Sequence, residues 1–278
     1  MKSLDVLSIG NITKDIIEND SGNYFEIGGS SFYASRVCEE LNLKSGIISS
    51  LSKDLPLKTL LPYTEFFSQL GNSTTTFVNS YRNDIRIQRV LSEAASIDLS
   101  KFKYPSDWDA PKIVFICPVL NEVSNDFFNI FEESKKICNL QGWMRSIDED
   151  GEIHSNKYLP NLNYSLIDVV VTSESDIEDE HINQIAKMVP MICVTRGRKG
   201  CTVISDNDQI DYKTEKIKAI DETGAGDVWA TVFSISRFIR AFEINESVEM
   251  ANIAAAISLG GVGSKNIPSL DQIINYKL

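Results

Sequence analysis

Apolar and polar residues alternate over short segments in the first third of the chain, and this period of two is typical of β-strands. Residues 4–9 alternate and stop at Gly10, which predicts a strand that ends in a loop. Two apolar segments flank a polar tip within 16–27 and predict a hairpin. The alternation on both arms of 74–81 and 85–90 predicts a second hairpin.

Apolar runs later in the chain lack this alternation. The run at 113–117 is continuously apolar, which suits a strand buried on both faces of a parallel sheet. Similar central strands are predicted at 46–52, 167–171 and 191–195, and a further strand at 201–204 follows the turn 196–200.

Helices are predicted between and after these strands. The helical segments are 30–41, 56–70, 126–140 and 247–259, with another helix opened by residues 224–227. The order of elements predicts one doubly wound α/β domain over 1–278, whose sheet is mostly parallel. A small β-sheet lid is expected from strands inserted at about 11–27 and 74–90.

Composition narrows the class of protein without changing the fold. A net charge of -12 and a pI near 4.7 argue against a nucleic-acid partner. We find no signal peptide and no apolar run long enough to span a bilayer, so we expect a cytoplasmic protein without a membrane partner. Five scattered cysteines with no C-x-x-C pair make zinc and a disulfide framework unexpected: Cys38, Cys117, Cys138, Cys193 and Cys201.

The segment 221–227, Asp-Glu-Thr-Gly-Ala-Gly-Asp, holds the candidate chemistry. Its small residues leave the backbone nearly bare where a helix is expected to begin, and the free amides of a first helical turn bind anions. Asp227 is either a simple helix cap or a base beside an anion hole. Spacing alone leaves these two interpretations open.

The same segment closely resembles the C-terminal signature of the PfkB (ribokinase-like) carbohydrate kinases. The resemblance implies that Asp227 is the catalytic base and that Gly224, Ala225 and Gly226 form the anion hole. Glu222 stands where the family commonly has Thr or Pro. The same resemblance implies a ribokinase-like fold and a chain that transfers a phosphoryl group from ATP to an alcohol.

A second resemblance concerns the acceptor. The Gly-Gly turn and small residues at 28–41 are similar to the family's N-terminal signature, although Tyr33 replaces an Asn that contacts the sugar in many members. The expected substrate-binding residues are Asn11, Asp15, Gly28, Gly29, Ser30, Tyr33, Asn79, Arg86, Gln88 and Arg145. Taken singly, Asp15 can also be a solvated loop carboxylate, Arg145 a surface residue, and the lid residues the wet face of a hairpin.

A third resemblance concerns ATP and its metal ion. Thr-x-Gly-x-x-Gly at 195–200 is similar to the family's nucleotide-side turn, although an unliganded basic turn is the alternative. Glycines after the helix at 247–259 do not meet the spacing of a phosphate-binding Walker loop. Expected nucleotide-binding residues are Thr195, Gly197, Gly200, Thr223, Asn252, Ala255, Gly261 and Gly263. Asp176, with Glu174 as a near competitor, is expected to help organise Mg²⁺ through water.

These expectations favour a kinase acting on a small sugar or polyol. The patterns at 75–88 and 141–145 resemble the inositol-kinase-like branch, while a nucleoside kinase of the same family stays open. A non-catalytic sugar- or nucleotide-binding protein would share the pocket but need no base. A dinucleotide-dependent oxidoreductase is disfavoured because 224–229 does not complete G-x-G-x-x-G. Lid sheets in this family often pair between protomers, so a homodimer through the lid is also expected.

Overall fold

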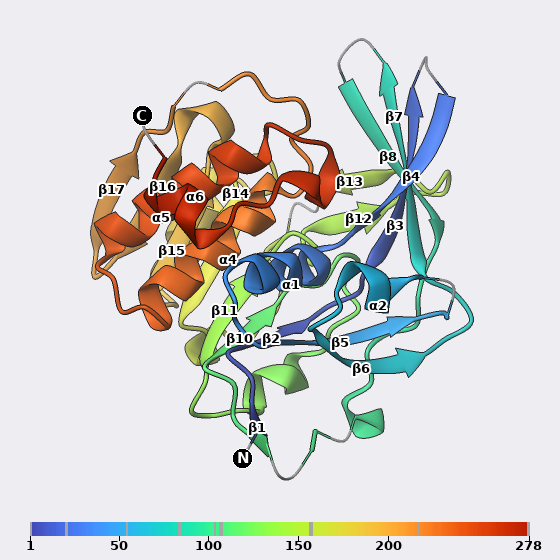
Figure 1. The fold of residues 1–278 in the computed structure, drawn as a ribbon, viewed down its shortest axis with the longest axis horizontal. Helices are drawn as coiled ribbons and strands as arrows, with labels where there is room; N and C mark the ends of the chain where they lie inside the picture. Colours follow the sequence, from blue (N-terminus) through green and yellow to red (C-terminus); the bar gives the residue numbers. More distant parts are fainter. Residues whose placement is uncertain are drawn as a thin grey trace.

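The computed structural model describes residues 2–19, 22–53, 55–82, 85–102, 104–105, 108–155, 158–215 and 217–276. Within these residues the largest sheet has nine strands in the order β17-β16-β15-β14-β11-β10-β2-β5-β6 (Figure 1). The strands are β2 (Val6–Ile9), β5 (Ser45–Leu51), β6 (Glu65–Leu70), β10 (Ile113–Ile116), β11 (Lys135–Asn139), β14 (Val169–Ser173), β15 (Met191–Thr195), β16 (Cys201–Ser205) and β17 (Asp208–Tyr212). All neighbouring pairs are parallel except β15–β16 and β16–β17.

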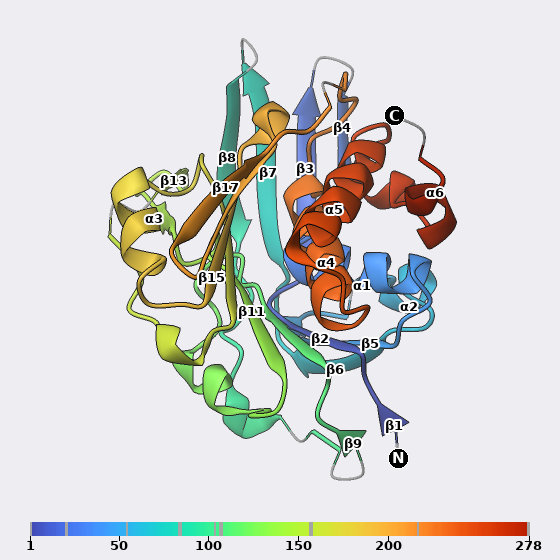
Figure 2. The same ribbon diagram turned by 90° about the vertical axis from the view of Figure 1, so that its left-hand side faces the viewer.

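Helices and 3₁₀ turns cover the two faces of this sheet (Figure 2). One face carries α1 (Ser30–Glu40), α2 (Leu57–Leu60), α4 (Ala225–Phe238), α5 (Ile244–Ser258) and α6 (Leu270–Ile274). The other carries α3 (Asp179–Ile185) and the 3₁₀ turns η2 (Asn125–Asn129) and η3 (Tyr164–Leu166). None of the helices in the described ranges combines the length and the apolar character that crossing a membrane needs.

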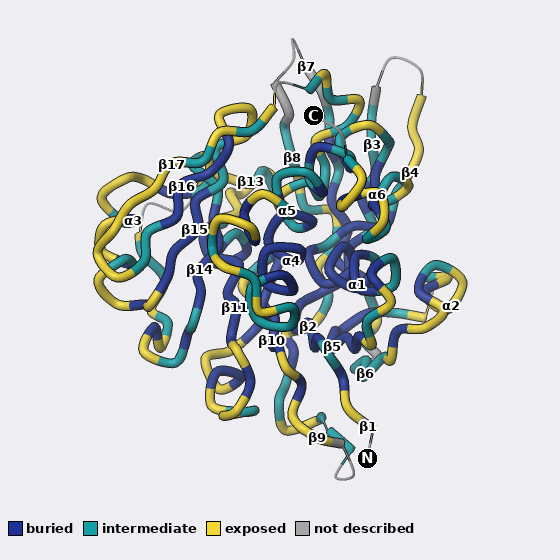
Figure 3. The backbone as a smooth tube through the Cα atoms, turned by 60° about the vertical axis from the view of Figure 1, so that its left-hand side comes forward, coloured by how far each residue is buried: buried dark blue, intermediate teal, exposed yellow. Residues whose placement is uncertain are grey.

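Successive residues of the central strands point into different cores. Val6 and Phe115 pack under α1, α4 and α5, whereas Leu7 and Val114 pack on the opposite face with Phe127. Figure 3 shows these strands and the helices α1 and α4 as the most buried part of the chain. The continuous apolar run at 113–117 thus follows from burial on both faces, as its sequence predicted.

A four-stranded sheet projects beyond one edge of this layered body (Figure 1). Its order is β4-β3-β7-β8, from β3 (Thr13–Asn19), β4 (Gly22–Gly28), β7 (Thr75–Arg82) and β8 (Ile85–Ser92). These strands lie where the two hairpins were predicted. Shorter pairs are β1 (Lys2–Ser3) with β9 (Trp108–Asp109), and β12 (Arg145–Ile147) with β13 (Ile153–Ser155). The expected architecture, a ribokinase-like α/β fold with a small lid-like sheet, is confirmed.

The helix predicted at 56–70, with Pro62 as a break or a first helical residue, forms only before that proline, and the part after it is wrong. Its helical part is the single turn α2, and the chain then turns near Pro62 before it forms β6 at the edge of the sheet. Proline ends the helix because it lacks an amide donor and its ring clashes with the preceding turn. The remaining aromatic residues, Phe66 and Phe67, suit a strand.

The helix predicted at 126–140 is also wrong. Only the 3₁₀ turn η2 forms there, Phe131 has a positive φ of 55°, and the chain then enters β11 between β10 and β14. Phe127, Ile130 and Phe131 stand at the spacing of a helical stripe because all three pack in or against the core beneath the sheet. The error matters for the site, because it hides the carboxyl end of a central strand.

Candidate active site

A cavity of about 610 Å³ lies at the carboxyl ends of the central strands, between the lid sheet and the start of α4. Eighteen of the predicted site residues line it: Asp15, Gly29, Ser30, Tyr33, Gln88, Arg145, Glu174, Asp176, Thr195, Gly197, Gly200, Thr223, Gly224, Ala225, Gly226, Asp227, Asn252 and Ala255. Open α/β sheets bind ligands at this edge. The fold therefore gathers residues from both ends of the sequence around one space.

The loop 221–227 turns sharply into α4. Gly224 is the N-terminal cap of the helix and has a left-handed φ of 78°. A Cβ at Gly224 would lie 2.3 Å from the ring of Tyr33, so the ring packs directly on this backbone. A Cβ at Gly226 would meet no atom within 4 Å, so the first helical turn is open to the cavity. The amides of such a turn lack helical acceptors and are suited to bind an anion.

The carboxylate of Asp221 holds this loop in place. Its Oδ1 accepts a hydrogen bond of 2.9 Å from the amide of Thr223, and its Oδ2 accepts one of 2.8 Å from the amide of Gly263. Gly263 belongs to the 3₁₀ turn η5 (Gly263–Asn266) that follows α5. The loop 221–227 is thereby fastened to the segment that follows α5.

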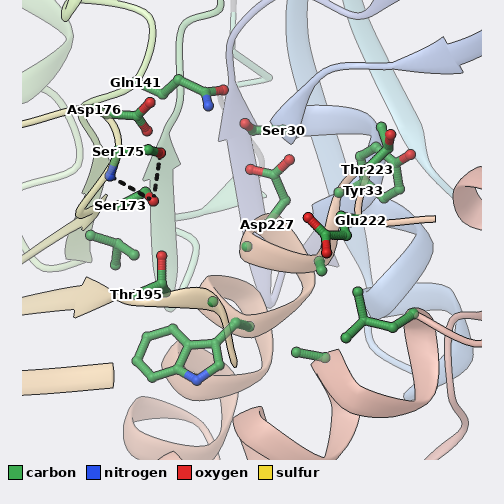
Figure 4. Close-up of a pocket in the computed structure, with 18 of the residues that line it drawn as sticks. Ser30, Tyr33, Gln141, Ser173, Ser175, Asp176, Thr195, Glu222, Thr223 and Asp227 are labelled. Atoms are coloured by element: carbon green, nitrogen blue, oxygen red, sulfur yellow. Dashed lines mark hydrogen bonds between the residues drawn. The ribbon is translucent and has the colours of Figure 1, made fainter. Parts of the chain in front are cut away.

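Asp227 lies in the first turn of α4, and its side chain points toward Ser30 in Figure 4. Its Oδ1 accepts a hydrogen bond of 3.1 Å from Asn139 Nδ2. Loss of hydration raises the pKa of this carboxyl to about 6, although the hydrogen bonds from Ser30 and Asn139 and the charge of Arg145 act in the opposite direction. A carboxylate with this pKa is charged at neutral pH and can still take up a proton, as a general base must.

Asn139 was not predicted as a site residue. It is the last residue of β11, the strand that the sequence pattern assigned to a helix. The side-chain nitrogen of Asn139 also lies 3.4 Å from Ser30 Oγ. Asn139 therefore links Ser30 of α1 with Asp227 of α4. The signal that could have found it is Ile137-Cys138 followed by Gly142, an apolar pair that ends in a loop.

Two further acids come from the end of β14, and their surroundings differ. Asp176 is half-buried on the wall opposite Asp227, beside Gln141 (Figure 4), and loss of hydration raises its pKa. Glu174 pairs with Arg196 Nη1 at 3.2 Å and with Lys199 Nζ at 3.1 Å, and these contacts lower its pKa. Asp176 is therefore the acid that faces the cavity without a bound cationic side chain of its own.

One half of the cavity lies under the lid sheet and holds residues that the sequence predicted to bind the phosphoryl acceptor. We call it the acceptor half. Asp15 is buried on β3, and its Oδ1 accepts a hydrogen bond of 2.9 Å from Thr13 Oγ1. A Cβ at Gly28 would come within 2.5 Å of Asp15 Oδ2, which explains the glycine there. Phe77 and Tyr33 supply aromatic surface to the same half. The side chains that line this half therefore include one carboxylate and two aromatic rings.

The other half of the cavity lies between η4 (Gly197–Lys199) and α5 and holds residues predicted to bind the phosphoryl donor. We call it the donor half. Gly197 and Gly200 have positive φ values of 53° and 101°, so the predicted turn does need its glycines. On the opposite wall, the indole nitrogen of Trp229 donates a hydrogen bond of 2.8 Å to Asn252 Oδ1. Ala255 lines the cavity from the next turn of α5.

Several predicted residues lie outside the cavity lining: Asn11, Gly28, Asn79, Gly261 and Gly263. Asn11 is buried, and its Oδ1 accepts a hydrogen bond of 2.8 Å from the amide of Ser50. Asn79 Oδ1 accepts one of 2.8 Å from Gln88 Nε2 and so orients a residue that does line the cavity. The side chain of Arg86 lies outside the described residues.

The residues present fit Mg²⁺ in only one way. Among the described residues, no three His, Cys, Asp or Glu side chains gather into a metal-binding group. Mg²⁺ commonly keeps several waters and takes one or two carboxylates together with substrate phosphates. Asp176, half-buried and facing the cavity, suits that kind of site.

Comparison with known proteins places this geometry in a family. The pattern of the pfkB family carbohydrate kinases matches residues 72–271. An ATP-dependent 6-phosphofructokinase of Thermoanaerobacterium thermosaccharolyticum is 25% identical over 312 residues, covering 98% of this chain and 93% of that protein.

Solved structures agree on the fold. A pyrophosphate-dependent kinase of the ribokinase family, complexed with a pyrophosphate analog and myo-inositol, superposes with a TM-score of 0.76 at 16% identity, covering 97% of this chain and 98% of that one. Ribokinase of Arabidopsis thaliana, complexed with ribose and ATP, gives 0.72 at 15% identity and covers 99% and 100%. Because the family pattern spans most of the sequence and includes the loop at Asp227, the chain belongs to the pfkB family of carbohydrate kinases.

Proposed function

We propose that this kinase transfers the terminal phosphoryl group of ATP to a hydroxyl of a ring-shaped polyol or sugar, with Asp227 as the base. The observation that carries the proposal is the position of Asp227. Its carboxylate stands in the first turn of a helix whose start is open to the cavity, and its pKa is about 6. One turn thus supplies both an acceptor for a proton and amides for the charge of the transferring group.

The chain's own side chains divide the remaining work. Asn139 and Ser30 orient the Asp227 carboxylate toward an acceptor hydroxyl. Amides at the start of α4 stabilise the negative charge on the phosphoryl oxygens while the group moves from donor to acceptor. Positioning and electrostatics supply most of the rate in such transfers.

The donor half favours a nucleotide over pyrophosphate. Beyond the anion-binding loop, the cavity continues along small and apolar side chains of Ala219, Ile217, Ala255, Ala256 and Leu259. These groups suit the faces of a purine ring, and pyrophosphate would leave them without a partner. ATP is therefore the proposed donor, although a pyrophosphate-dependent kinase is among the similar structures.

Mg²⁺ is the proposed companion of ATP. Asp176 would hold it through water, and the ion would neutralise charge on the donor phosphates. Glu174 is the weaker candidate, because Arg196 and Lys199 already engage its carboxylate.

The acceptor half suits a hydroxylated ring. Asp15 can accept hydrogen bonds from two neighbouring hydroxyls, while Tyr33 and Phe77 line the cavity and can contact the apolar side of a cyclitol or sugar. A nucleoside, whose ribose would meet the same groups, is the second candidate acceptor. The aromatic ring of Tyr33 where many relatives have an Asn is the reason for preferring rings.

A matrix of donors and acceptors tests the proposal. The purified protein is assayed with ATP or pyrophosphate against myo-inositol, ribose, fructose, fructose 6-phosphate and adenosine, with and without Mg²⁺. We expect turnover with ATP and one of the ring acceptors, and loss of turnover when the metal is chelated. Turnover with pyrophosphate but not ATP would remove the donor assignment. Binding without any turnover would favour a non-catalytic binding protein.

A further inference from the structure

Glu122 is a buried carboxylate that the reaction described above does not use. It lies in the loop after β10, and only 6% of its surface is exposed. Burying a charge is costly unless hydrogen bonds replace its lost hydration. The contacts of Glu122 therefore show what its charge does in the fold.

Four contacts with three backbone amides converge on the Glu122 carboxylate. The amide of Asn11 donates to its Oε1 at 2.8 Å, and the amide of Leu120 donates to its Oε2 at 2.7 Å. The amide of Val119 lies 3.0 Å from both oxygens. The carboxylate thus fastens its own loop to Asn11 in the loop that follows β2, at the edge where the cavity opens.

The same loop holds Arg145. The carbonyl of Val119, whose amide binds Glu122, accepts a hydrogen bond of 2.9 Å from Arg145 Nη1. The guanidinium also lies over the ring of Phe77 on the lid sheet, 5.4 Å from the ring centre. Arg145 lines the cavity together with Asp176 and Asp227.

We propose that Glu122 is a positioning residue for phosphoryl transfer: it fixes the Val119 peptide, and that peptide fixes the Arg145 guanidinium in the cavity that Asp176 and Asp227 also line. The proposal rests on the proposed function. Arg145 supplies the positive charge that keeps Asp227 in its charged form and that a transferring phosphoryl group can meet. A carboxylate buried away from the reaction thus sets where that charge stands.

The charges around Asp227 define a test. The titratable and charged groups that act on it are Arg145 from β12, Asp176 after β14, Tyr33 from α1 and the buried thiol of Cys117. Arg145 is the cation among them and lowers the pKa of Asp227, whereas Asp176 raises it. Displacing the guanidinium must therefore move the acidic limb of the pH–activity curve upward.

The experiment compares Glu122→Gln, Arg145→Met, their double variant and the exposed control Glu133→Gln. Glutamine keeps the size of the side chain but replaces one acceptor oxygen with a donor. In Arg145→Met we expect the acidic limb of kcat/KM to rise on the order of one pH unit. Glu122→Gln should shift it in the same direction, the control should match wild type, and the double variant should match Arg145→Met alone.

Each outcome is decisive. Additive shifts in the double variant, or a folded Glu122→Gln enzyme with an unmoved limb, would overturn the proposal. If Glu122→Gln does not fold, Arg145→Met still tests the second link, because a wild-type limb in that variant removes the role of Arg145. An inactive wild-type protein in the donor and acceptor matrix is a different result, and it counts against the proposed function instead.

Discussion

The acceptor and donor halves of the cavity are held together by different forces. Around Asp227 and Asp15, hydrogen bonds from Asn139, Ser30 and Thr13 fix each carboxylate at a buried or half-buried position. The donor half carries exposed charges, such as Arg198, which lies 3.7 Å from Glu222 with most of both side chains exposed. Buried hydrogen bonds fix geometry, whereas exposed ion pairs contribute little energy and yield to salt.

This difference makes a general prediction. Changes in the acceptor half should lower turnover steeply and resist salt, because they disturb a set geometry. Changes in the donor half should be mild and depend on ionic strength. The variants below test each side of that contrast.

The largest effect is expected from Asp227→Asn. The amide keeps the shape but cannot take a proton, so turnover should fall by a factor on the order of 10²–10⁴ while ATP binding is kept. Steady-state kinetics and calorimetric titration with ATP measure the two quantities. Asp271→Asn, at the first turn of α6, is the matched control for helix stability. Near-normal turnover in Asp227→Asn would show that Asp227 is not the base.

Asp15→Ala should come next. A charged group that binds a substrate hydroxyl contributes roughly 1.5–3 kcal/mol, so catalytic efficiency should fall about 10- to 100-fold. ATP affinity measured without the acceptor should hardly change, because the proposed nucleotide site lies across the cavity from Asp15. Lys14→Ala, on the opposite face of β3, serves as the control. Unchanged efficiency in Asp15→Ala would place the acceptor elsewhere.

The pH dependence of the wild-type enzyme gives a third test. The pKa of Asp227 is about 6, above the usual value for Asp. The charged form therefore predominates above that pH and is lost below it. We expect kcat/KM for the acceptor to fall about tenfold between pH 7 and pH 5. A flat profile over this range would separate Asp227 from the rate.

Gly224→Ala and Gly226→Ala separate conformation from access. Alanine at position 224 must adopt a left-handed φ and meets the Tyr33 ring, which should cost about 1–3 kcal/mol of the free energy of unfolding. At position 226 the backbone is helical and the added methyl meets no protein atom, so stability should be kept while turnover falls. Thermal unfolding and kinetics, measured on both variants, distinguish the two effects. Equal stability would show that the turn tolerates a side chain.

The smallest effect is expected from Arg198→Ala in the donor half. Because the side chain is exposed, its loss should raise the KM for ATP only about two- to fivefold at low salt, and the difference should shrink as salt is added. Kinetics across a salt series, with the exposed Lys187→Ala as control, measure this change. An effect that is large and independent of salt would contradict the contrast between the halves.

The sequence predicted the fold and the sharp turn into α4 because their signals are local. The alternating hairpins and the small residues at 224–226 act on their own backbone, so short patterns reveal them. Asn139 and Glu122 escaped because their roles depend on distant partners: one meets α4, and the other meets the residue after β2. The false helix at 126–140 had a related origin, since Phe127, Ile130 and Phe131 have helix-like spacing but all pack beneath the sheet without forming a helix.

The bond between Asp221 and Gly263 has a consequence for how the protein is made. When residues 1–227 have been synthesised, the side chains of the acceptor half are present. The carboxylate of Asp221 still lacks its second partner, the amide of Gly263. Amides late in the sequence complete it, and α5 adds the wall that carries Asn252. Chains that stop before residue 263 therefore lack a fully fastened anion-binding loop. The loop before α4 therefore reaches its final geometry only after the segment around residue 263 has been made.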